Sequence, residues 1–101
     1  MSWSASKPRL RELTITVQNT PVVILETSDN PTGRITVNAE GDFDSGNLEV
    51  GYLSDGAFTV YTDAVTTVDG GYELACGSSK DVLVQATGAS PVINVAVQSV
   101  S

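Results

Sequence analysis

The feature that most constrains this chain is the regular alternation of short apolar runs and turn residues between positions 47 and 97. Within each run the apolar side chains occupy every second position, as in Tyr72, Leu74 and Cys76, and clusters of Gly, Asp, Ser or Pro separate the runs. A period of two is typical of strands with one buried face, and turn clusters at this spacing favour antiparallel hairpins. The same alternation occurs at residues 13–17 and 35–39.

Residue composition supports an all-β fold. Valine, isoleucine and threonine supply 29 of the 101 residues, and β-branched side chains suit pleated surfaces better than helices. The pattern predicts eight strands, or nine if residues 65–68 form one. Short strands at this spacing bury their apolar faces either in two packed sheets or in a closed barrel. We therefore expect an antiparallel β-sandwich or small barrel of about eight strands.

Charge divides the chain into two parts. Residues 1–11 contain Lys7, Arg9 and Arg11 and no acid, whereas residues 12–101 contain twelve acids against Arg34 and Lys80, a net charge of −10. The first eleven residues are rich in serine and contain Pro8, so we expect an extended basic N-terminal arm followed by one β domain at 12–101. The acidic domain argues against direct nucleic-acid binding, which needs a basic surface.

Few catalytic groups are available. The chain has no histidine, which excludes histidine triads and histidine zinc sites, and its single cysteine, Cys76, has no histidine base and looks like a small core residue. We therefore expect no enzyme activity, cofactor or metal. Neither a signal peptide nor a membrane span is visible in the sequence, which predicts synthesis in the cytosol and no membrane partner.

Two segments are candidates for binding another protein. The arm carries an isolated aromatic side chain, Trp3, beside its three cations, a combination that suits an acidic, partly apolar groove on a partner. The second segment is a continuous apolar run, which predicts a strand covered on both faces, either at the centre of the sandwich or at a subunit contact. The predicted contact residues are Trp3, Lys7, Arg9, Arg11, Val22, Val23, Ile24 and Leu25.

Three stretches, at residues 46–58 (GNLEVGYLSDGAF), 69–74 (DGGYEL) and 84–90 (VQATGAS), give the chain a family resemblance. Their order resembles that in small β-sandwich virion proteins of tailed bacteriophages, and above all the decoration or cement proteins of the head. The resemblance implies a non-catalytic protein on the capsid surface of the virion, a homo-oligomer such as a trimer, which binds the major capsid (coat) protein and reinforces contacts between coat subunits. Residues 1–11 match no motif of that family, so the resemblance does not describe how the arm docks.

The sequence is also compatible with other functions. Asp42 and Asp44 could offer oxygens to calcium, although the loop lacks the EF-hand register, and scattered acids such as Asp55 and Asp63 could pair as in a glycosidase. Tyr52, Phe58 and Tyr72 fall at expected core positions, which leaves Tyr61 and Phe43 as exposed aromatics. With Asp63, Tyr61 could serve a carbohydrate-binding or host-adhesion module of a phage neck or tail. An acidic protein that mimics DNA is a third class.

Overall fold

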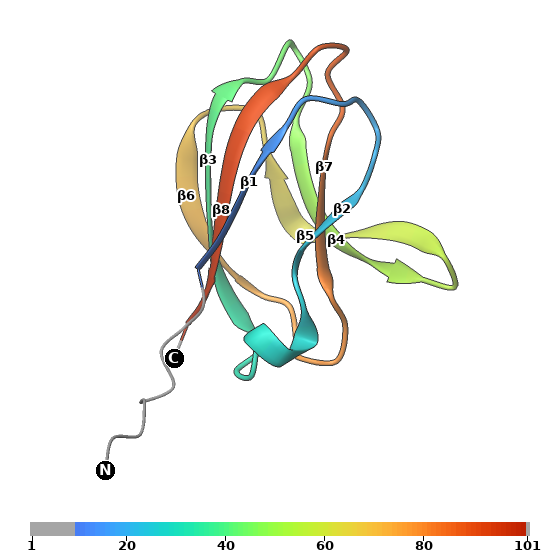
Figure 1. The fold of residues 1–101 in the computed structure, drawn as a ribbon, viewed down its shortest axis with the longest axis vertical. Coiled ribbons are helices and arrows are strands. Elements are labelled where there is room, and N and C mark those ends of the chain that lie inside the picture. The colour runs from blue at the N-terminus through green and yellow to red at the C-terminus, as the bar shows by residue number, and fades with distance from the viewer. Residues whose placement is uncertain (1–9, 101) are drawn as a thin grey trace.

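The computed structural model describes residues 10–100, with the backbone but not the side chains of residues 62–64. Eight strands account for most of these residues, and one short 3-10 helix, η1 (Thr27–Asp29), follows the second strand (Figure 1). The strands are β1 (Leu10–Ile15), β2 (Val22–Leu25), β3 (Arg34–Asp42), β4 (Leu48–Ser54), β5 (Ala57–Thr66), β6 (Gly70–Ala75), β7 (Val82–Ala86) and β8 (Val92–Ser99).

The strands form two four-stranded antiparallel sheets, in the order β1-β8-β3-β6 and β2-β7-β4-β5. We call them sheet A and sheet B. Successive strands alternate between the sheets everywhere except at β4 and β5, which is the strand order of a jelly roll. The predicted all-β antiparallel sandwich of about eight strands is therefore confirmed.

One detail of the predicted strand pattern is wrong. Only β4 and β5 pair as consecutive strands, so most of the expected hairpins are instead crossings from one sheet to the other. A turn cluster indicates that the chain reverses, but it does not say with which strand the next one pairs. Residues 65 and 66 continue β5 and Val68 lies in the following turn, so no ninth strand forms there.

The β4–β5 hairpin follows the local sequence closely and projects from the body of the sandwich (Figure 1). Asp55 and Gly56 both have positive φ, at 51° and 81°, as a two-residue turn between twisted strands requires. On β4, Gly51 lies so close to β5 that a Cβ atom there would be 2.1 Å from the carbonyl oxygen of Thr59. Gly51 therefore permits a close approach of the two strands that no other residue allows.

The core lies between the facing surfaces of the four central strands. Ile35, Val37 and Ala39 on β3 alternate inward with polar outward neighbours, as the sequence predicts. Burial of these aliphatic side chains stabilises the fold by roughly 1.5–3 kcal/mol for each large one. The other members of this core cluster on the central strands are Leu48, Val50, Val82, Val84, Ala86, Ile93, Val95 and Val97.

Two leucines of β4 test this packing with the same substitution. Leu48 is fully buried, whereas Leu53 is 45% exposed. Leu48→Ala should lower the free energy of unfolding by about 2–5 kcal/mol because it leaves a cavity, and Leu53→Ala by about 1 kcal/mol or less. Urea unfolding of the two variants measures the difference; equal losses would contradict the placement of β4.

Candidate protein-docking site

Each sheet has two edge strands, β1 and β6 in sheet A and β2 and β5 in sheet B. Of these, β1 and β2 lie next to one another on the same side (Figure 1). Within residues 10–100, β1 pairs only with β8, and β2 only with β7. Each strand therefore presents unpaired backbone groups along its outer edge, which is the feature that strand-binding partners use. We call this side the β1–β2 edge.

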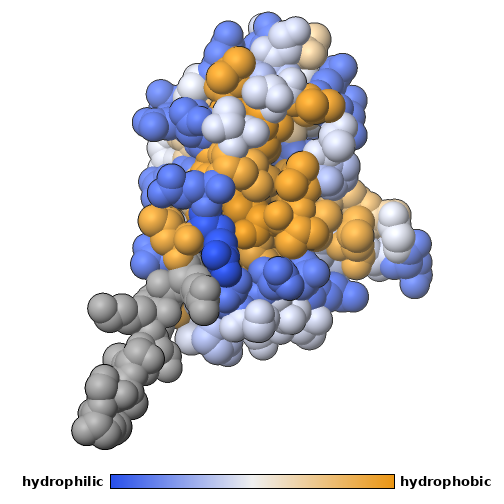
Figure 2. All heavy atoms as spheres, in the orientation of Figure 1, coloured by the Kyte–Doolittle hydropathy of each residue, from blue (hydrophilic) through white to orange (hydrophobic). Residues whose placement is uncertain are grey.

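A shallow apolar groove of about 160 Å³ runs along the β1–β2 edge. Its aliphatic lining comes from Leu13 and Ile15 on β1, Val17 after β1, and Val22 on β2, and threonine side chains complete it. Figure 2 shows that hydrophobic side chains gather on this face of the molecule. Of the aliphatic residues, Val17 is 56% exposed and Val22 41%. Exposed apolar side chains gathered in this way make the groove a candidate site of protein interaction.

The predicted contact run on β2 divides between the surface and the core. Val22 and Val23 are exposed, at 41% and 44%, whereas Ile24 and Leu25 are buried. The register of β2 on β7 shifts between Val23 and Leu25, and this bulge turns two successive side chains inward. Of the two predicted placements of this strand, the centre of the sandwich is wrong, because β2 is an edge strand of sheet B, and a subunit contact stays a prediction. Only Val22 and Val23 remain available to a partner, at an edge and not at the centre of the sheet.

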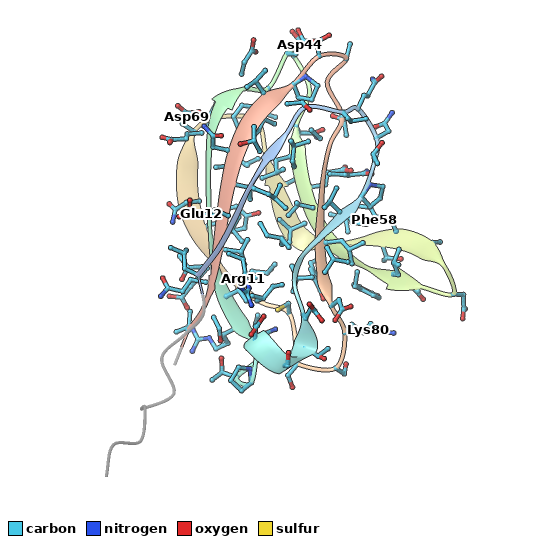
Figure 3. The ribbon with its side chains drawn as sticks, viewed as in Figure 1. Arg11, Glu12, Asp44, Phe58, Asp69 and Lys80 are labelled. Atoms are coloured by element: carbon cyan, nitrogen blue, oxygen red, sulfur yellow. The ribbon has the colours of Figure 1, made fainter. Side chains whose placement is uncertain are left out.

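Contacts between elements of the two sheets flank the groove on either side. On one side the guanidinium of Arg11 on β1 lies 2.8 Å from the carboxylate of Asp29 in η1 (Figure 3). On the other side the loop between β1 and β2 is held to sheet B, because the backbone N–H of Asn19 donates to the carbonyl of Ala86 at 2.7 Å. The Gln18 side chain donates to the carbonyl of Thr87 nearby, at 3.0 Å. The groove is thus a fixed feature of the fold.

The structure describes only the end of the predicted arm. Leu10 and Arg11 belong to β1, where they pair with Gln98 and Val97, so this part of the arm is an edge strand. Arg11 is engaged with Asp29, and a half-exposed ion pair of this kind contributes about 1 kcal/mol or less. The other predicted contact residues of the arm, Trp3, Lys7 and Arg9, lie outside the described residues.

Hydrogen bonds to its own carboxylates fix the conformation of the acidic loop after β3. Phe43 is buried in the core, so its predicted exposure is wrong. The carboxylate of Asp42 accepts from the backbone N–H of Asp44 at 2.8 Å, and that of Asp44 accepts from the N–H of Ser90 at 2.7 Å. These bonds turn the loop inward and carry Phe43 with it. Among the described residues, no group of three or more His, Cys, Asp or Glu side chains is arranged to hold a metal ion.

A second hollow, of about 490 Å³, lies on the outer face of sheet A. Three carboxylates line it: Glu12 from β1, Glu40 from β3, and Asp69 from the turn before β6 (Figure 3). Asp69 accepts a hydrogen bond from the backbone N–H of Gly41 at 3.0 Å. These acids are far apart in the sequence, so no local sequence pattern predicts that they cluster.

Tyr61 and Tyr72 pack against the core, and the Tyr52 ring is tilted by 36° from that of Tyr61. The ring centroids of Tyr61 and Tyr52 lie 5.0 Å apart, and the ammonium of Lys80 lies 5.7 Å from the Tyr52 ring. Burial, followed by the charges of Cys76 and Tyr52, raises the pKa of Tyr61 to about 12. The side chain of Asp63 lies outside the described set, so the predicted Tyr61–Asp63 glycan contact stays a prediction.

Cys76 is half-buried just after β6 and packs against the core, in keeping with the predicted packing role. Its Sγ lies 3.5 Å from the Nδ2 of the fully buried Asn30 and 3.5 Å from the carbonyl oxygen of Gly33. Burial raises the pKa of the Cys76 thiol, opposed by its hydrogen bonds. A raised thiol pKa leaves little reactive thiolate, so the site offers no activated nucleophile.

Comparisons with known proteins bear on the fold. Neither a protein-family model nor a curated protein matches the chain. A de novo designed double-stranded β-helix, solved by solution NMR, matches at a TM-score of 0.52 with 15% identity, over 89% of this chain and 96% of that one. At this identity the likeness shows the fold alone. A structure titled "Bacillus endospore appendages form a novel family of disulfide-linked pili" aligns at a TM-score of 0.48 with 15% identity, over 98% of this chain and 96% of that one.

No helix in the described part of the chain has the length and hydropathy of a membrane-spanning segment.

Tyr72 provides a test of the packing around the tyrosines. Its hydroxyl is buried without a hydrogen-bond partner, and burial raises its pKa to about 12. Because the pKa is higher in the folded than in the unfolded protein, where it is about 10, the free energy of unfolding is unaffected by the ionisation of this group below pH 10. It then falls as the pH rises from 10 towards 12. Tyr72→Phe should therefore change stability at pH 7 by about 1 kcal/mol or less and make stability fall less steeply above pH 10. Urea unfolding at pH 7 and pH 11 measures both; a large loss at pH 7 would contradict the assignment.

Proposed function

We propose that this chain is a non-catalytic structural protein that works by docking its β1–β2 edge on other protein subunits. The observation that carries the proposal is the pairing of two free strand edges with an exposed aliphatic groove between them. Free edges supply main-chain hydrogen bonds and the groove supplies apolar contact, which together give affinity without reactive groups. The closed packing of the remaining core provides a rigid scaffold for this surface.

In its specific form the proposal is a head-decoration or cement protein of a tailed bacteriophage, bound to the major capsid protein on the virion surface. The turn motifs at 46–58, 69–74 and 84–90 support this form, through their resemblance to such proteins. A jelly roll is compatible with it, but the same fold occurs in capsid proteins, lectins and cupins, so the fold does not choose among them. The proposal of a coat-protein partner therefore rests on the sequence resemblance. The proposed mode of docking rests on the free strands of the β1–β2 edge.

The physical effect of such a protein follows from mass action. A chain that binds assembled coat subunits and not free ones stabilises the assembled particle, and many copies repeat the effect over the shell. The excess of acids over bases on the body gives the covered particles like charge, which keeps them apart in solution. Val22 and Val23 are the described residues that we expect to touch the partner.

Lysine substitutions at the edge test the proposal. The double variant Val22→Lys, Val23→Lys places charges on the proposed contact and should reduce occupancy on empty phage heads at least tenfold, together with the protection of those heads against heat. Val68→Lys is the matched control, because Val68 is also an exposed valine but lies in the turn between β5 and β6, 67% exposed. Both variants should keep the circular dichroism of the parent.

Two results would count against this function. Equal heat resistance of heads with and without the bound protein would remove the cementing role. Equal loss of occupancy in the edge variant and the Val68→Lys control would show that binding depends on charge and not on the β1–β2 edge.

A further inference from the structure

We propose that the groove of the β1–β2 edge binds residues 1–9 of a second copy of this chain, with Trp3 as the anchoring side chain. The inference rests on the proposed function, since it names an occupant of the same edge. It adds a specific consequence: neighbouring copies are linked to one another through their N-terminal segments.

The groove has the features of a site for an extended segment. Aliphatic and threonine side chains line it, it holds about 160 Å³, and contacts between the sheets flank it on either side. A strand lying along it can hydrogen-bond to the free edge of β1 and place alternate side chains between Leu13 and Val22. A site of this size suits one large anchor, and tryptophan is the side chain that most often provides such an anchor.

Residues 1–9 match this site in chemistry. They contain the only tryptophan of the chain, two cations at Lys7 and Arg9, and no acid. Glu26, directly after β2, is exposed and forms no ion pair with a described residue. A cationic segment along this edge would therefore gain a partner. Residues 10–100 carry twelve acids against three bases, so any copy attracts the segment of another.

The position of Pro8 favours a second copy over the same molecule. A tight two-residue hairpin onto its own β1 would place Pro8 and Arg9 at the centre of the turn. Such hairpin turns require positive φ at the first central position, and proline is fixed near −65°. Proline also holds Lys7 in extended conformations. Nine extended residues reach at most about 30 Å, which is enough to span to a neighbouring molecule.

The single tryptophan makes the inference directly measurable. Because Trp3 is the only tryptophan, its fluorescence reports its own surroundings. As the full chain is concentrated, the emission should shift from the wavelength of a solvated indole to that of a buried one. Val17→Lys, which puts a cation in the groove, should weaken this transition roughly tenfold or more, and Val68→Lys should leave it unchanged.

A mixing experiment separates binding in a second copy from binding in the same one. A trace of the parent chain is titrated with an excess of Trp3→Ala, which provides empty grooves and no fluorescence. We expect the trace emission to shift as the variant is added, and this result does not depend on a groove variant that folds. An emission that is buried at every concentration would place Trp3 in its own molecule, and an emission that stays solvated throughout would mean that the groove is empty; either result overturns the inference.

The outcome also separates this inference from the proposed function. A chain that protects phage heads but shows no transition in solution would overturn the link between copies and leave the docking role standing. A chain that shows the transition but does not bind heads would support the link between copies and contradict the decoration role.

Discussion

Face-to-face packing of sheet A on sheet B is the constraint on which the rest of this structure depends. Valines and isoleucines of β3 and β8 meet those of β7 and β4 in one apolar layer, and each strand on its own would expose that face to water. Because the chain crosses between the sheets at almost every turn, neither sheet can form without the other. The same geometry leaves both β1 and β2 at an edge, and it thereby creates the surface to which we assign function.

Alternation within a strand predicts burial well where the strand lies at the centre of a sheet. At Ile35, Val37 and Ala39 the pattern alone identifies the inward face, and Asp55-Gly56 identifies its turn because only certain backbone angles suit it. Prediction fails where a long-range contact overrides the local pattern. Phe43 lies between two aspartates in a polar loop. The hydrogen bond from the backbone N–H of Ser90 that holds this loop inward cannot be predicted from the residues next to Phe43.

The candidate site shows the same limit. The sequence predicts Val22 and Val23 as contact residues because they belong to an apolar run. The bulge that turns Ile24 and Leu25 inward depends on the pairing of β2 with β7, which the sequence does not show. The groove itself joins Leu13 and Val17 to Val22, and the acidic hollow joins residues of three separate elements. Sites of this kind are products of topology, and a sequence read along one strand at a time does not reveal them. An acidic body with an apolar edge can recognise a partner by shape and charge alone.

Amide hydrogen exchange of the full chain, dilute and concentrated, tests most directly whether the β1–β2 edge is the surface that binds. In dilute solution the amides of β3 and β8 that pair within sheet A should exchange slowly, and those on the free edges of β1 and β2 should exchange fast. On concentration we expect new protection at β1 and β2. New protection confined to the β4–β5 hairpin or to β6, with β1 and β2 unchanged, would contradict the account.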